Sequence, residues 1–223
     1  MPTLHRPENR SAAALFDFGG VFTESPFLAF ASFAQEIDAP PTEIVEIVFG
    51  PYHQDTDHPW HRLERGEMNL VDAREAIMAT ASARGYEIDP LRVLAKMSMG
   101  GGTRDLLVER VRALHEVGVK TGLVTNNAPE FREHWRPVLP LDELFDEVVD
   151  SSEVGMRKPD PAIFHLTLEK LGGPDPDRCV FLDDAESNVE VARALGIHGI
   201  VVGPDPGSAI DELDAWSKQQ VTR

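Results

Sequence analysis

The chain has 223 residues, a formal net charge of −17 and a pI of about 4.8, which limits the partners it can bind. So acidic a surface repels nucleic-acid phosphates, and we exclude nucleic acid as a partner. No apolar run reaches the ~18–20 residues of a membrane span, and the polar N-terminus lacks a signal core. The only cysteine, Cys179, allows no internal disulfide. Together these features predict a cytoplasmic protein with no membrane partner.

Short apolar strands alternate with helices along most of the chain. The predicted strands are rich in β-branched residues and cover Ala13–Phe16, Val119–Val124, Val148–Val149, Cys179–Leu182 and Gly199–Val202. Helices with capping residues, proline or glycine at their ends lie between the later strands, as at Ala162–Leu171 and Val189–Leu195. This alternation predicts an α/β fold with a doubly wound, Rossmann-like parallel sheet.

One interval interrupts the alternation. From about Thr23 to about Gly102 the pattern is helical, with candidate helices at Ser25–Ile37, Thr42–Phe49, Leu70–Arg84 and Leu91–Met97. We expect residues 23–102 to form an all-helical cap inserted after the first strand, and residues 1–22 and 103–223 to form the core. The glycine run at residues 100–102 and the loop at residues 22–26 are the expected hinges.

Four polar segments follow predicted strand ends, where open α/β sheets bind ligands. In the first, Asp17 can offer its carboxylate to a substrate, and Gly19 and Gly20 let backbone N–H groups approach phosphate oxygens. In the second, Thr125 and Asn126 place a hydroxyl and an amide ahead of a helix N-terminus, which suits an anion. We therefore take Gly19, Gly20 and Asn126 as candidate substrate-binding residues. Taken singly, either segment is also explained as a turn or a helix cap.

The third and fourth segments supply opposite charges. Lys158, in the proline-rich residues 155–161, can neutralise a phosphoryl group or an anionic nucleophile, although a lysine in such a turn is usually only solvated. Asp183 and Asp184 follow an apolar strand, and two adjacent acids are costly there without a positive charge between them and Asp17. Their hard oxygen atoms suit Mg²⁺. The alternative is that Asp184 caps the next helix.

The order of these segments, with a helical insertion after the first, resembles the haloacid dehalogenase-like hydrolases whose cap follows the first motif. The resemblance covers about residues 12–203. It implies that Asp17 attacks phosphorus and becomes an aspartyl-phosphate, while Thr125 and Lys158 hold the transferring group. It also implies a Mg²⁺ ion bound by Asp17, the Gly19 carbonyl and Asp184, with Asp183 either bound to the ion or beside it.

One position departs from the phosphatases of this family, which usually carry a second aspartate two residues after the nucleophile. Gly19 occupies that position instead. The loss matters because general acid–base catalysis typically raises a reaction rate by ~10²–10⁴-fold. Glu24 or a histidine of the insertion (His53, His58 or His61) could replace the missing acid.

Three functions follow from this pattern. The favoured one is a Mg²⁺-dependent phosphatase of a small phosphorylated metabolite. The runner-up is a 2-haloacid dehalogenase, in which Asp17 would attack carbon and no metal would be used. Gly19 is compatible with it, whereas the acid pair Asp183 and Asp184 argues against it. A catalytically weak binding or regulatory protein explains Gly19 but not the intact Thr125, Lys158 and Asp184. The substrate and the oligomeric state are not readable from the sequence.

Overall fold

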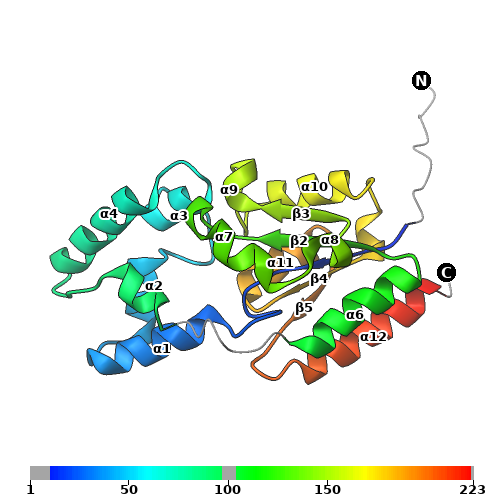
Figure 1. The fold of residues 1–223 in the computed structure, drawn as a ribbon, viewed down its shortest axis with the longest axis horizontal. Coiled ribbons are helices and arrows are strands. Elements are labelled where there is room, and N and C mark those ends of the chain that lie inside the picture. The colour runs from blue at the N-terminus through cyan, green and yellow to red at the C-terminus, as the bar shows by residue number, and fades with distance from the viewer. Residues whose placement is uncertain (1–10, 97–103, 222–223) are drawn as a thin grey trace.

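A parallel five-stranded sheet forms the centre of the computed structural model, which describes residues 11–96 and 104–221 (Figure 1). The strands are β1 (Ala13–Phe16), β2 (Lys120–Thr125), β3 (Glu147–Asp150), β4 (Cys179–Asp183) and β5 (His198–Val201). They lie in the order β3-β2-β1-β4-β5, and every neighbouring pair is parallel. All five strands were expected near these positions, so the predicted α/β class is confirmed.

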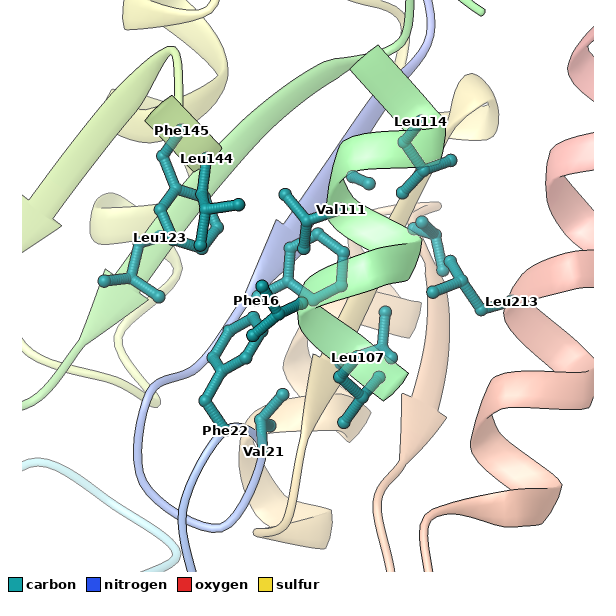
Figure 2. Packing of buried hydrophobic residues seen from close by; sticks show 14 of the residues in the cluster. Phe16, Val21, Phe22, Leu107, Val111, Leu114, Leu123, Leu144, Phe145 and Leu213 are labelled. Atoms are coloured by element: carbon teal, nitrogen blue, oxygen red, sulfur yellow. The ribbon is translucent and has the colours of Figure 1, made fainter. Parts of the chain in front are cut away.

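Helices cover both faces of the sheet. On one face lie α6 (Asp105–Glu116), α8 (Leu141–Leu144) and α12 (Gly207–Val221), and on the other α10 (Pro161–Lys170) and α11 (Glu186–Ala194). The short elements are α7 (Arg132–Trp135), α9 (Ser151–Val154) and three 3-10 turns, Pro129–Phe131, Arg136–Val138 and Pro176–Arg178. Figure 2 shows the apolar packing between the sheet and the helices α6, α8 and α12, in which Phe16 of β1 packs against Leu107 and Val111 of α6. The preceding residue, Leu15, points to the opposite face of the sheet and packs with the residues of α10 and α11, because successive side chains of a strand alternate between its two faces.

The segment between β1 and α6 is helical. It contains α1 (Pro26–Glu36), α2 (Pro41–Val48), α3 (Pro59–Glu64), α4 (Leu70–Ala83) and α5 (Pro90–Leu94), and we call Pro26–Leu94 the helical insertion. Its described residues include no strand. The insertion lies beyond one end of the sheet, at the left of Figure 1, and has an apolar cluster of its own, which Ala128 and Phe131 of the core join. The helical character predicted for this interval is thus confirmed in its described residues, and α3 is an additional helix.

Proline sets most of the helix starts in the insertion. Four of its helices begin with proline, at Pro26, Pro41, Pro59 and Pro90. A proline at the first helical position loses no hydrogen bond and already has a helical φ. The expected hinge at residues 100–102 lies outside the described residues. No helix in the described ranges has the length and apolar character to span a membrane.

Candidate functional site

The carboxyl ends of the central strands bring the predicted site residues together. Asp17 directly follows β1, Thr125 ends β2, and Asp183 ends β4. β1 and β4 are paired in register, and the Asp17 N–H donates to the Leu182 carbonyl at 2.8 Å. Parallel pairing therefore places residues that are far apart in sequence at one edge of the sheet.

A buried lysine joins two carboxylates at this edge. Lys158 is 1% exposed, and its Nζ lies 2.7 Å from Asp17 Oδ1 and 2.7 Å from Asp183 Oδ2. The Asn126 side chain holds the lysine backbone: Oδ1 accepts from the Lys158 N–H at 2.8 Å, and Nδ2 donates to the Lys158 carbonyl at 2.9 Å. A buried ammonium group requires such ion pairs to offset its lost hydration. Lys158 is therefore a fixed part of the site and not a solvated turn residue.

Three carboxylates converge beside this lysine. One oxygen atom each of Asp17, Asp183 and Asp184 lies within 4.8 Å of the others. Asp183 is already engaged, because it also accepts from the Ala185 N–H at 2.8 Å and from Asn188 Nδ2 at 3.0 Å. Asp184 Oδ2 is buried with no hydrogen-bond partner in the part of the chain that the structure describes. Such gathered oxygen atoms are the ligands that hard divalent cations take.

Asp184 does not cap the following helix. Ala185 is the N-cap residue of α11, and no side chain caps this helix end. The carboxylate that reaches the Ala185 N–H belongs to Asp183. The capping explanation that the sequence left open for Asp184 is thus not what the structure shows.

Crowded negative charge changes the proton affinity of the site. Burial, with the charges of Asp183 and Asp184 adding to it, raises the pKa of Asp17 to about 8, although Lys158 opposes this. Burial and the charge of Asp183 likewise raise the pKa of Asp184 to about 7. Burial alone would lower the pKa of Lys158, but the charges of Asp17 and Asp183 outweigh it and raise that pKa. The lysine stays charged, while the carboxylates need further positive charge to ionise fully.

The loop after Asp17 requires glycine at one of its two glycine positions. Gly20 has a φ of +71°, and a Cβ built on it would lie 2.1 Å from Asp184 Cγ and Oδ2. Its carbonyl accepts from Arg104 Nη1 at 2.7 Å. At Gly19, by contrast, a Cβ would meet only Pro26 Cδ, at an ordinary 3.8 Å. The close approach of Asp184 therefore depends on Gly20.

Gly20→Ala is expected to weaken the binding of a divalent cation at least about tenfold, because the added Cβ takes the place of the Asp184 carboxyl group. Gly118→Ala is the matched control: Gly118 has a φ of +77°, but nothing lies within 4 Å of its Cβ position. Both variants carry the strain of a left-handed alanine, roughly 1–2 kcal/mol, so only the clash differs. Titration calorimetry with Mg²⁺ compares the two, and equal affinities would refute the role of Gly20.

Two histidines of the insertion serve its local structure. His61 Nδ1 accepts from the Thr56 N–H at 3.0 Å, and His58 Nδ1 accepts from the Trp60 N–H at 3.2 Å. Burial lowers the pKa of His58, and it lowers that of His61 to about 3, so both rings are neutral near pH 7. His53 is exposed. Local packing explains the rings of His58 and His61 without a role in proton transfer.

Arg104 and Asn188 belong to the site although the sequence assigned them no role. Arg104 holds the Gly20 carbonyl from 84 positions away, and its charge lies near Asp184 and Glu24. No local pattern signals such a contact. Asn188 lies five positions after Asp183, which it holds through one turn of α11. A polar residue in the first turn of the helix that follows the acid pair is a signal that could have been used.

Comparison with known proteins identifies the family. The family model of the haloacid dehalogenase-like hydrolases matches residues 12–196. The chain belongs to this family. It is 31% identical over 207 residues to acyl-CoA dehydrogenase family member 10 of Mus musculus, a match that covers 91% of this chain and 19% of that protein. The chain spans about a fifth of the length of the first curated relatives that it matches.

Two solved structures illustrate the shared fold of this hydrolase family. A family enzyme from Bacteroides thetaiotaomicron, in complex with magnesium and inorganic phosphate, is 22% identical with a TM-score of 0.56, covering 87% of this chain and 96% of its own. The L-2-haloacid dehalogenase of Xanthobacter autotrophicus, with chloropropionic acid covalently bound, is 19% identical with a TM-score of 0.56. That match covers 86% of this chain and 77% of the dehalogenase chain. At these identities the similarity shows the fold alone. The two structures confirm the fold predicted from the sequence, and the match to the family model confirms the predicted family.

Proposed function

We propose that this haloacid dehalogenase-like hydrolase is a Mg²⁺-dependent phosphatase of a small phosphorylated metabolite. The observation that carries the proposal is the charge balance of the site: three carboxylates converge, those of Asp17, Asp183 and Asp184, and Lys158 pairs with only the first two. With all three acids ionised, this cluster repels a phosphate dianion unless a divalent cation is added. The same excess charge argues against a metal-free dehalogenase, whose haloacid substrate is also an anion.

The donor set fits a magnesium ion. The unpartnered Asp184 Oδ2, the Asp17 carboxylate and the Gly19 carbonyl would hold it, since Mg²⁺ takes few protein oxygens and keeps several waters. Asp183 would ligate it less directly, because its oxygen atoms already serve Lys158 and α11. When bound, the ion would neutralise charge on the transferring phosphoryl group. The magnesium and phosphate in the Bacteroides thetaiotaomicron relative support this choice of metal.

Asp17 would act as the nucleophile. A carboxylate oxygen attacks phosphorus, the bond from phosphorus to the leaving oxygen breaks, and that oxygen keeps the electron pair and takes up a proton. Water then attacks the aspartyl-phosphate, which releases phosphate and restores Asp17. Lys158 would bind the transferring group from one side, where its Nζ already contacts Asp17.

Several groups would orient the phosphoryl oxygens. We assign the Thr125 hydroxyl to this task, together with the backbone N–H groups of Gly19 and Gly20. Asn126 would contribute through its backbone N–H, because both ends of its side-chain amide are engaged by the Lys158 backbone. Phosphoryl transfer depends mainly on positioning and on neutralisation of negative charge, and these groups would supply both.

We further propose that residues 23–102 act as a cap over Asp17 and that the enzyme works in the cytoplasm. The insertion reaches the edge of the site: Ser187 Oγ donates to the Tyr52 carbonyl at 3.4 Å, and Leu70 N donates to Glu130 Oε1 at 2.8 Å. A cap in this place would exclude water during reaction.

Hydrolysis of p-nitrophenyl phosphate tests the proposed function. Protein treated with EDTA is expected to lose at least about 100-fold in rate and to recover it with Mg²⁺, because charge neutralisation carries much of this reaction. Chloride release from 2-chloropropionate, run in parallel with EDTA present, would favour the dehalogenase instead. If neither substrate reacts although inorganic phosphate binds, the binding-protein alternative replaces the phosphatase.

The raised pKa values predict that the metal-free protein loses stability as pH rises. Asp17 and Asp184 bind protons more tightly in the folded than in the unfolded state, so the stability they add at low pH is lost progressively as pH rises from the unfolded value of 3.8 to the folded values of about 7 and 8. Mg²⁺ takes the place of these protons, so it should raise Tm more at pH 9 than at pH 6. Differential scanning calorimetry of EDTA-treated protein, with and without added Mg²⁺, measures the rise in Tm at pH 6 and at pH 9. An equal gain at the two pH values would contradict the assignment.

A further inference from the structure

A buried arginine beside Lys158 connects the core to the helical insertion. Arg157 is 0% exposed and directly precedes Lys158 in the loop after α9. Its Nε donates to Glu64 Oε2 at 2.7 Å, and its Nη1 lies 3.6 Å from Asp55 Oδ1 and 3.5 Å from the Gln54 carbonyl. Two consecutive side chains thus have different partners: the lysine contacts the carboxylates of the core, and the arginine contacts the insertion.

The insertion presents Glu64 to this arginine in a fixed position. Glu64 Oε1 accepts from Trp60 Nε1 at 2.8 Å, so both of its oxygen atoms are engaged. The Trp60 ring is itself held against Phe49, with ring centroids 4.7 Å apart. At the end of α3, a Cβ on Gly66 would lie 2.7 Å from the Ser152 carbonyl, so the insertion packs directly on the backbone of α9. These contacts hold α3 against the loop that carries Arg157.

From these contacts we infer that Arg157 is a positioning residue: by pairing with Glu64, it links closure of the helical insertion to the placement of Lys158 beside Asp17. This inference rests on the proposed phosphatase function. The backbone of Lys158 is held by Asn126, and the side chain of the preceding residue is held by Glu64. Opening of the insertion removes the second of these restraints, so Lys158 is fully restrained only when the site is covered.

This ion pair can open without a large penalty. A buried ion pair contributes little net stability, because desolvation offsets much of the attraction between the charges. Arg157 Nη2 is buried and has no partner within residues 11–96 and 104–221. An N–H group in that state is unfavourable until water reaches it. Lifting the insertion would hydrate Nη2 and Glu64, so the covered and uncovered states can exchange as substrate enters.

Arg157→Lys tests the role in positioning. Lysine keeps the charge but loses the planar fork of donors that fits Glu64. On p-nitrophenyl phosphate with Mg²⁺, we expect kcat to fall by about tenfold to a hundredfold while KM changes by less than about threefold, as for a misplaced catalytic group. Arg74→Lys is the matched control, because Arg74 pairs with Asp89 in two contacts of 2.9 and 2.7 Å that lie inside the insertion. Its kcat should stay within about twofold of wild type.

Hydrogen exchange of Glu64→Gln gives a readout that does not depend on activity. We expect faster exchange in α3 and in residues 151–158, with α6 unchanged, because the amide keeps the shape of Glu64 but loses its charge. Faster exchange with an unchanged kcat in both variants would overturn the positioning role, and unchanged exchange would overturn the link between core and insertion. If the wild-type protein lacks phosphatase activity, the proposed function fails, whereas the exchange result still decides whether Arg157 and Glu64 hold the insertion closed.

Discussion

Asp17→Asn is expected to lower turnover of p-nitrophenyl phosphate by at least about 10³-fold, because an amide is neither a nucleophile nor a good metal ligand. The fold should survive. Burial and neighbouring carboxylates raise the pKa of Asp17 to about 8, so its ionised form is unfavourable in the folded protein at high pH. A neutral amide removes that cost, and Lys158 keeps Asp183 as a partner. We therefore expect a Tm at pH 8 that equals or exceeds that of the metal-free wild type.

Asp160→Asn is the matched control for this substitution. Asp160 caps α10 by accepting from the Ala162 N–H at 2.8 Å, a task that asparagine performs about as well. The Asp160→Asn variant also replaces an aspartate of the core by asparagine, on the loop that carries Lys158. Its phosphatase activity should stay within about twofold of wild type. A purified Asp17→Asn protein that keeps a tenth or more of the wild-type kcat would rule out Asp17 as the nucleophile.

The position of Asp17 could be predicted because buried parallel strands have a simple sequence signature. Ala13–Phe16 is buried at every position, since helices cover both faces of the sheet. Such a strand is a continuous apolar run, and the first acid after it must lie at the carboxyl edge. The same reasoning placed Thr125 and Asp183, because β2 and β4 are also buried runs that neighbour β1.

The partners of these residues could not be predicted, because they depend on tertiary contacts. The Asn126 amide bonds the backbone of Lys158 from 32 positions away, and Arg157 pairs with Glu64 across 93 positions. Neither contact leaves a period or a cap in the local sequence. The helix that carries Glu64 was also missed, since α3 has only six residues and follows a polar stretch. Periodicity needs several turns before it can be recognised.

Gly19→Asp is expected to raise kcat on alkyl phosphates by about 10²-fold or more while changing the rate on aryl phosphates little. Alkyl leaving groups need a proton as the bond to phosphorus breaks, whereas aryl leaving groups hardly do. The structure has room for the change: Gly19 is not in the left-handed region, and its nearest contact would be Pro26 Cδ at 3.8 Å. Parallel kinetics on glycerol phosphate and p-nitrophenyl phosphate measure the ratio. A loss on both substrates would show that the new side chain disturbs the site.

The size of that gain depends on whether another residue already supplies the proton. Glu24 is exposed two residues before the insertion begins at Pro26, and the charge of Arg104 lies near both Glu24 and Asp184. If Glu24 relays a proton through water, Glu24→Gln should slow glycerol phosphate hydrolysis at least about tenfold more than aryl phosphate hydrolysis. If it only favours the N-terminal end of α1 through its charge, both rates should change equally or not at all. In that second case, a gain from Gly19→Asp with Glu24 intact means that the native enzyme works without an efficient acid. Its natural substrate should then have a good leaving group, such as an acyl or glycosyl phosphate.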